Sequence, residues 1–199
     1  MTASSNQGLL RIAADGQSLE VLATGLRNPD GIGLTPSGLI TAASSEGDWV
    51  PASLIAAIPP AHRGAPLHFG HGGLRESQPP ALPLAYLPRG EDNSAGGQAW
   101  CPEGAMGPLG GHLVHLSFGT GTAFLVLQDE VGGQLQGAVV PLPVSFRSGS
   151  HRGRFHAADG HLYVSGMNGW GSYTPDPGCL ERIRFVEPAD HAAVQMPIG

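Results

Sequence analysis

Short apolar segments, separated by turns rich in Gly, Pro and Asp, fill most of the chain. No segment keeps the period of an amphipathic helix, whereas apolar segments recur in pairs on either side of tight turns. Asp-Gly pairs such as the one in "ADGQ" are typical of turns that close β-hairpins. We therefore expect four hairpins, which pair residues 8–13 with 18–22, 31–34 with 38–43, 112–118 with 123–128, and 152–156 with 161–166. A further strand is expected at 179–185.

Residues 56–111 form a Gly- and Pro-rich stretch in which apolar positions follow almost no pattern. So long a stretch without regular elements is uncommon in a compact domain. We expect it to be a functional or packing excursion, or else a disordered one.

Two distant segments resemble each other and indicate an internal repeat. "GLTPSGLITAASSEGDW" and "FHAADGHLYVSGMNGW" share a turn Gly, an apolar strand and a polar loop that ends in Trp. Gly38 then corresponds to Gly160, and Gly47 to Gly169. A hairpin unit that recurs in an all-β chain is typical of a β-propeller, whose blades each have four antiparallel strands. Blades of about 40–50 residues predict one domain over residues 1–199 with about four blades or fewer, which allows an incomplete ring.

Composition and charge narrow the function classes. The chain has 31 Gly and 18 Pro among 199 residues, but its 41% of hydrophobic residues can bury a core. A formal net charge of −6 disfavours a nucleic-acid partner, because phosphate binding needs a basic face. Every basic residue is Arg, which excludes catalytic lysines within this chain.

The sequence gives little indication of membrane insertion, secretion or disulfide bonding. We expect no membrane span, because no apolar run approaches the roughly 20 residues that a bilayer requires. The first residues lack the basic segment and apolar run of a signal peptide. Cys101 and Cys179 are compatible with one disulfide bridge or with two free thiols.

Residues 25–49, "GLRNPDGIGLTPSGLITAASSEGDW", carry the most specific pattern of the chain. A Gly-x-Arg-Asn-Pro-x-Gly turn precedes two strands and an acidic, Gly-containing loop. Together with "DNSAGGQAW", "GGHLVHLSFG" and "RFHAADGHLYVSGMNGW", which follow in order, it resembles a bacterial, dehydrogenase-like branch of the soluble quinoprotein glucose/sorbosone dehydrogenase family of β-propellers. The resemblance extends over most of the chain.

The resemblance implies hydride transfer from a sugar, such as an aldose or sorbosone, to pyrroloquinoline quinone. By the same resemblance, Arg27 and Asn28 hold this cofactor: a guanidinium binds carboxylates and an amide can bond a quinone oxygen. It also implies a periplasmic or secreted protein. The chain departs from the family pattern after Asp48, and Asn168 stands near the position of a family lysine. The general-base His of the family lies in blades that precede the Arg-Asn-Pro turn.

Other polar residues are weaker candidates. Glu46 and Asp48 flank Gly47 and can supply oxygen ligands to Ca²⁺, or lie in a solvated loop. His68 and His71 can turn toward one metal, whereas His112 and His115 are expected on opposite faces of a strand. His156 and His161 are expected to face each other across a hairpin. Loop 91–97 can bind a sugar hydroxyl or Ca²⁺. Three Trp residues can stack on sugars or fill gaps between blades: Trp49, Trp100 and Trp170.

Two alternatives to the enzyme stay open. One is a non-catalytic propeller module that binds a carbohydrate or a protein partner. The other is a fragment whose ring is completed by self-association or by a partner chain. An Arg-Asn-Pro turn is also compatible with a purely structural corner, since Pro29 restricts the backbone of Asn28.

Overall fold

The computed structural model describes residues 8–48, 50–73, 79–169 and 176–187. These residues form four small sheets and a single 3₁₀ turn, η1 (Gly107–Leu109). Within these ranges no helix is long and apolar enough to cross a membrane. The all-β class expected from the sequence is confirmed.

Two of the sheets have four antiparallel strands, as a propeller blade does. The first contains β3 (Ile32–Leu34), β4 (Ile40–Ser44), β5 (Ser53–Ile58) and β7 (Ala85–Leu87), in that order. The second contains β8 (Ala95–Trp100), β9 (Leu113–Ser117), β10 (Thr122–Val131) and β11 (Gln134–Ser145).

The other two sheets have three strands among the described residues. One contains β12 (Gly149–Phe155), β13 (Leu162–Met167) and β14 (Gly178–Ile183). The last contains β1 (Gly8–Ile12), β2 (Leu19–Thr24) and β6 (Leu67–His68), and here β6 runs parallel to β2.

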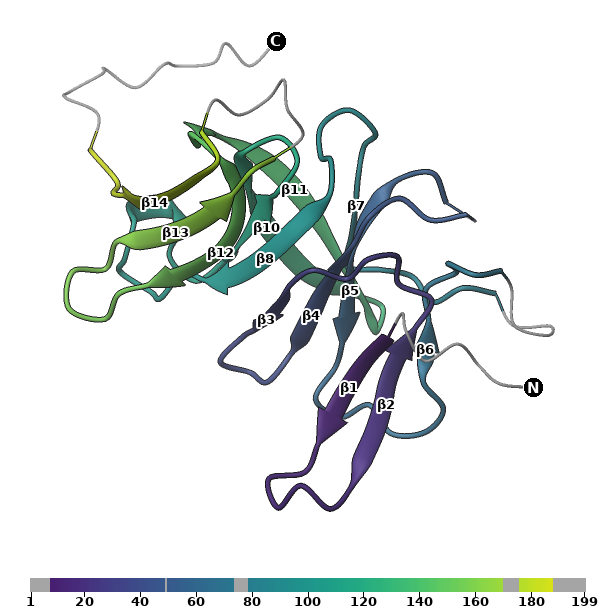
Figure 1. Cartoon of the computed structure of the whole chain (residues 1–199). Coiled ribbons are helices and arrows are strands. Elements are labelled where there is room, and N and C mark those ends of the chain that lie inside the picture. The colour runs from purple at the N-terminus through teal and green to yellow at the C-terminus, as the bar shows by residue number, and fades with distance from the viewer. Residues whose placement is uncertain (1–7, 49, 74–78, 170–175, 188–199) are drawn as a thin grey trace, which may run out of the picture.

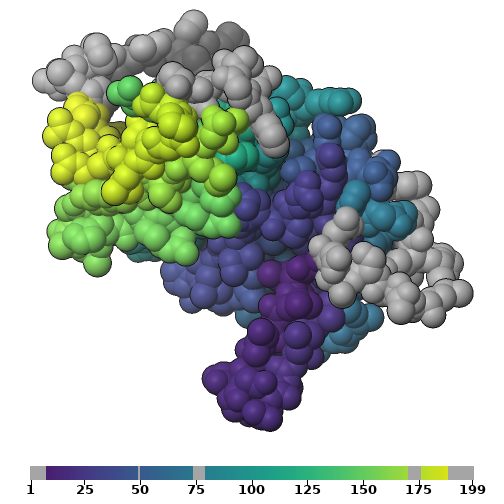
Figure 2. All heavy atoms as spheres, viewed as in Figure 1, coloured from purple at the N-terminus to yellow at the C-terminus, as the bar shows by residue number. Residues whose placement is uncertain are grey.

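The four sheets follow one another in an open arc rather than a closed ring (Figure 1). The first strands of three successive sheets, β3, β8 and β12, lie on the inner side of this arc, where β8 contacts both of the others. In the space-filling view the β1–β2 hairpin projects from one end and the β12–β14 sheet lies at the other (Figure 2). The described chain is therefore a partial propeller.

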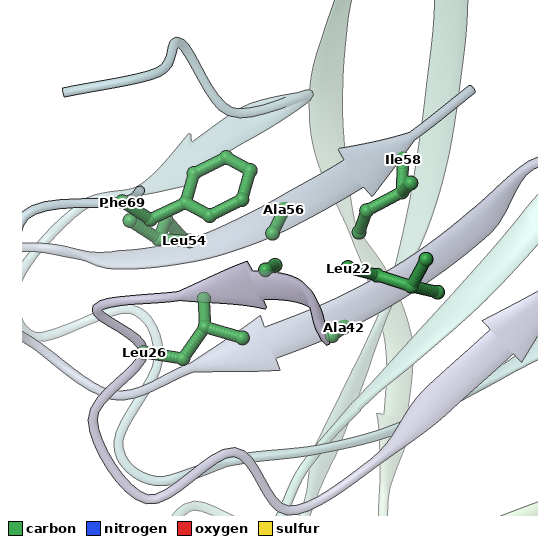
Figure 3. Close-up of a cluster of buried hydrophobic side chains, with 8 residues drawn as sticks. Leu22, Leu26, Ala42, Leu54, Ala56, Ile58 and Phe69 are labelled. Carbon is green, nitrogen blue, oxygen red and sulfur yellow. The ribbon is translucent and has the colours of Figure 1, made fainter. Parts of the chain in front are cut away.

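The hydrophobic core lies between the sheets, which is why the blades stack. Leu22 and Leu26 pack with Ala42, Leu54 and Phe69 where β2 meets the first four-stranded sheet (Figure 3). A second cluster joins the two four-stranded sheets, and a third joins the second of these to the β12–β14 sheet. Neighbouring sheets thus bury the faces that they turn toward each other.

All four predicted hairpins and the strand at 179–185 are confirmed, with shifts of a few residues at their ends. The proposed repeat is also visible in the fold. Gly38 and Gly160 occupy the equivalent turns β3–β4 and β12–β13, and both have a positive φ, 85° and 66°. Gly169, the counterpart of Gly47, follows the end of β13.

Residues 56–111 contain more regular structure than their sequence pattern indicates. This stretch contains the end of β5, the strands β6, β7 and β8, and η1. The strands β6 and β7 are only two and three residues long, and β8 includes two Gly residues. Such short or Gly-containing strands give no clear alternation of apolar and polar positions. Cys101 and Cys179, left open by the sequence, are both free thiols.

Candidate functional site

The Arg-Asn-Pro turn leads into the inner strand β3, and backbone contacts hold it in place. The amide of Arg27 donates to the hydroxyl of Ser44 at 2.8 Å, and the amide of Ser45 donates to the carbonyl of Arg27 at 3.0 Å. The preceding residue, Leu26, is fully buried in the core. The turn is therefore fixed on both sides, and the side chain of Arg27 leaves it in a defined direction.

Arg27 and Asn28 both point to the end of the sheets at which β4 and β7 finish. One guanidinium nitrogen of Arg27, Nη1, donates to the backbone carbonyl of Glu46 at 2.9 Å. Asn28 is exposed and adopts a left-handed φ of 43°, although Pro29 follows it. The extended conformation expected before a proline is thus not adopted, because Asn tolerates the left-handed region better than most residues.

A polar cavity of about 550 Å³ opens at this end of the sheets. Arg27 and Asn28 line it, together with Ser45 and Glu46 from the β4–β5 loop and with the β7–β8 loop, residues 88–94. Its volume lies in the range of small-molecule sites. The described lining includes no aromatic side chain, so its chemistry is that of charged groups, hydroxyls and amides.

Arg89 adds a second guanidinium to this cavity. This arginine was not among the candidate residues predicted from the sequence. Its Nε lies 3.4 Å from a carboxylate oxygen of Glu46, and its side chain is 73% exposed. Arg89 stands in "PRGEDN", a Gly-containing turn beside the acidic loop 91–97, and this context was the only signal for it in the sequence. Arg27 bonds to the backbone carbonyl of Glu46 and Arg89 faces its carboxylate, so the two guanidiniums meet at one residue of the lining. A guanidinium binds carboxylates well.

Asp92 is a fully buried carboxylate in the wall of the cavity. Its oxygen Oδ1 lies 3.7 Å from Nε2 of His115, whose side chain is also fully buried. No donor of the described residues lies within full hydrogen-bonding distance of either carboxylate oxygen, but His115, Ser117 and Ser53 stand close to them. Burial alone would raise the pKa of Asp92, but His115 and the hydroxyls of Ser117 and Ser53 hold this pKa below its usual value. Asp92 is therefore ionised at neutral pH.

The hydrogen bonds behind His115 fix its tautomer. Gln98 donates from its amide nitrogen to the carbonyl of Gly96 at 2.9 Å, and its amide oxygen accepts from Thr41 at 3.3 Å. The same amide nitrogen lies 3.2 Å from Nδ1 of His115, so Nδ1 is the acceptor. In neutral His115 the proton is then on Nε2 and faces Asp92.

The carboxylates of Glu46 and Asp48 are directed to different partners. Glu46 faces Arg89, whereas Asp48 lies 3.1 Å from Nδ1 of His71 and accepts from the amide of Gly72. The described residues contain no group of three or more His, Cys, Asp or Glu side chains that could hold a metal ion. The donor set for Ca²⁺ at Glu46 and Asp48 is thus a poor fit, and this site stays a prediction.

The His pairs of the sequence analysis have separate partners. His68 contacts the hydroxyl of Thr24 and the carbonyl of Gly73, while His71 contacts Asp48. His115 is buried in β9, whereas His112 lies just before this strand. His156 and His161 flank one turn, and each has a ring nitrogen within 3.5 Å of Asp159.

Of the three tryptophans, Trp100 lies among the residues that the structure describes. Trp100 packs against the cluster between the two four-stranded sheets, as expected for a residue that fills a gap between blades. Trp49 and Trp170 lie outside the described residues.

Comparison with known proteins gives a clear result for the fold. No family model and no curated protein matches the chain. Among solved structures, an oxidoreductase of Thermus thermophilus described as a glucose dehydrogenase superposes with a TM-score of 0.59 at 20% identity, and the match covers 82% of this chain and 46% of that protein. Two further structures named glucose dehydrogenase match at 20% identity, with TM-scores of 0.59 and 0.53.

These matches cover 88% and 86% of this chain, but only 54% and 45% of the two glucose dehydrogenases. The chain thus spans about half the length of the structures that it resembles. The likeness extends over nearly all of this chain and agrees with the resemblance carried by the Arg-Asn-Pro turn. Over about half of their length, this chain has the fold of the glucose dehydrogenases.

Proposed function

We propose that the chain is part of a quinoprotein-type sugar dehydrogenase and that its polar cavity binds pyrroloquinoline quinone. The observation that carries the proposal is the convergence of Arg27, Asn28 and Arg89 on one cavity. No carboxylate among the described residues pairs with Arg27, so its guanidinium is available to an anionic ligand. When bound, the quinone supplies a hydride acceptor for the oxidation of a sugar.

The chain's own residues would bind and orient this group. Arg27, held by the carbonyl of Glu46, presents its remaining N–H groups to a carboxylate of the ligand. Arg89 can leave Glu46 for a second carboxylate, because its side chain is largely exposed. The amide of Asn28 can bond an oxygen of the ligand.

The experiment is a titration of the chain with pyrroloquinoline quinone, with and without Ca²⁺, followed by tryptophan fluorescence. We expect saturable binding that weakens about 10- to 100-fold in Arg27→Ala, since a hydrogen bond to a charged group contributes about 1.5–3 kcal/mol. Arg11→Ala is the matched control, because Arg11 pairs with Glu20 on the projecting hairpin. Binding that is absent, or equal in all three proteins, would overturn the proposal.

A second candidate is a non-catalytic module that binds a carbohydrate. Its support is Asn168, an uncharged residue that stands near the position of a family lysine. Calorimetric titration with glucose in the absence of the quinone tests it. Native mass measurement in the same samples separates a monomer from an assembly in which a second chain completes the ring.

A further inference from the structure

A second cavity, of about 360 Å³, opens beside β3 at the point where β8 and β12 end. The polar cavity lies at the other end of these inner strands, because Asn28 precedes β3 and Asn93 precedes β8. Among the described residues, the two cavities share no lining residue. The second cavity is therefore separate from the proposed quinone site, and its volume is also in the range of small-molecule sites.

Two aromatic rings that line this second cavity are held by the core. Trp100, the last residue of β8, packs against the cluster that joins the two four-stranded sheets. Phe155, the last residue of β12, packs against the cluster between the second of these sheets and the β12–β14 sheet. Both side chains are only partly buried, so each leaves part of its surface to the cavity in a fixed position.

Exposed aliphatic side chains extend this apolar surface. Ile32 and Leu34 line the cavity from β3, and they are 60% and 64% exposed. Residues two apart on a strand point to the same face, so these two side chains lie next to each other. Four large apolar side chains from three successive sheets thus meet at one cavity, which is typical of a binding site rather than of a solvated surface.

Arg154 is the one charged residue among the described residues of this lining. One of its guanidinium nitrogens, Nη1, donates to the backbone carbonyl of Gly153 at 2.7 Å, and no described carboxylate pairs with it. Arg152, two residues earlier, lies 3.4 Å from Oδ1 of Asp30, which follows the Arg-Asn-Pro turn and whose Oδ2 is 2.7 Å from Nε2 of His151. Unlike Arg152, Arg154 therefore has N–H groups that are available to an anion at the cavity.

We propose that this second cavity binds a small aromatic carboxylate. The carboxylate would pair with the guanidinium of Arg154, which can donate two parallel hydrogen bonds. The ring of the ligand would lie against Trp100 and Phe155 in the offset or edge-to-face arrangements that aromatic pairs prefer. This inference goes beyond the proposed function, because the ligand would bind without the quinone and without a sugar.

The lining disfavours other classes of small ligand. A cation would be repelled by Arg154, which no acidic residue of the described lining offsets. A sugar needs several hydrogen-bond partners, but the amide of Gln98 is already bonded to Gly96 and Thr41. Apart from Gln98 and Arg154, the described lining residues have apolar side chains or, at Gly33, none.

The first test uses a fluorescent probe of this class, anilinonaphthalene sulfonate, which carries an anionic group on an aromatic body. Phenylnaphthylamine is the neutral probe, because it has the same rings without the sulfonate. We expect Arg154→Gln to raise the Kd of the sulfonate about 10-fold, while the Kd of the neutral probe stays unchanged. Arg63→Gln is the matched control, since Arg63 is also exposed and also donates to backbone carbonyls.

A second variant tests the apolar part of the cavity. Leu34→Ser should raise the Kd of both probes about 3- to 10-fold, because it removes apolar surface from the lining. It should leave the fold intact, since this side chain is 64% exposed. Leu19→Ser is its control, because Leu19 is 58% exposed and lies on the projecting hairpin.

Displacement of the probe tests the carboxylate itself. Phenylacetate should displace the sulfonate from the wild-type chain, and phenylacetamide, which has the same ring without the charge, should do so at least about 10-fold more weakly. Equal displacement by both, or equal affinity of the sulfonate for wild type and Arg154→Gln, would overturn the proposal.

The control variants decide whether the probes report on this cavity. An effect of Arg63→Gln or Leu19→Ser as large as that of its matched variant would also overturn the proposal, because the probe would then bind elsewhere. The quinone titration concerns the other cavity, so either proposal can fail while the other stands.

Discussion

Gly31 and Gly97 lie in backbone contact where the inner strands β3 and β8 begin. Because a Cβ on Gly31 would meet backbone atoms of Gly96 and Gly97, no rotamer change can relieve the overlap. We expect Gly31→Ala to lower the free energy of unfolding by about 1–3 kcal/mol.

Urea denaturation followed by fluorescence measures this loss. Gly47→Ala is the control, because a Cβ there would lie 3.5 Å from the nearest atom, an ordinary contact. Equal stability of the two variants would contradict the close approach of β3 and β8.

Asp92 should make stability depend on pH in the acid range. Its pKa in the folded chain lies below the ordinary value of 3.8. The ionised carboxylate therefore contributes stability that is fully present above pH 3.8 and is lost as the pH falls through the lower, folded-state pKa.

We expect the free energy of unfolding of Asp92→Asn to fall less steeply than that of the wild type between about pH 4 and pH 2. Urea denaturation at several pH values measures the two slopes. Identical slopes would show that Asp92 does not carry this dependence. The control is Glu91→Gln, which changes an exposed neighbour.

Leu26 links the core to the site, since it is fully buried and directly precedes Arg27. Leu26→Ala should leave a cavity between β2 and the first four-stranded sheet and lower the free energy of unfolding by about 2–5 kcal/mol. Leu82→Ala, at a position that is 64% exposed, should change it by less than about 0.5 kcal/mol. Thermal denaturation of both variants provides the comparison.

The two cysteines should stay reduced and react slowly in the folded chain. Burial raises the pKa of Cys101 to about 11, so roughly one thiol in a thousand is ionised at pH 8. Burial also raises the pKa of Cys179, which is less buried. With iodoacetamide at pH 8, mass spectrometry should show Cys179 modified before Cys101. A mass two units below that of the dithiol form would instead reveal a disulfide.

Local patterns predicted the hairpins, and long-range contacts account for most of what they missed. Asp-Gly, Pro-Ser-Gly and Gly-Thr-Gly turns, each flanked by a pair of apolar segments, were enough for four hairpins. The strand β11 was missed although it spans Gln134–Ser145. It contains Pro141 and Pro143, and proline argues against a strand unless the strand lies at the edge of a sheet, as β11 does.

The residues of the candidate site also differ in whether a local pattern or a long-range contact brings them together. Arg27 and Asn28 could be found because they belong to one continuous motif. Arg89 and Asp92 join them only through the order of the strands, and the partners Asp30 and His151 are 121 positions apart. No spacing rule along the chain predicts such a contact, since it depends on how far the sheets fan around the arc.

The ion pair between Asp30 and Arg152 spans 122 residues, which has a consequence for the order of folding. Contacts this distant in sequence form late, because the intervening chain must first be ordered. During synthesis the Arg27 turn would emerge and pack on its own sheet while its partners on β12 are still unmade. The turn that carries Arg27 would therefore make its last contacts only after three successive sheets have docked.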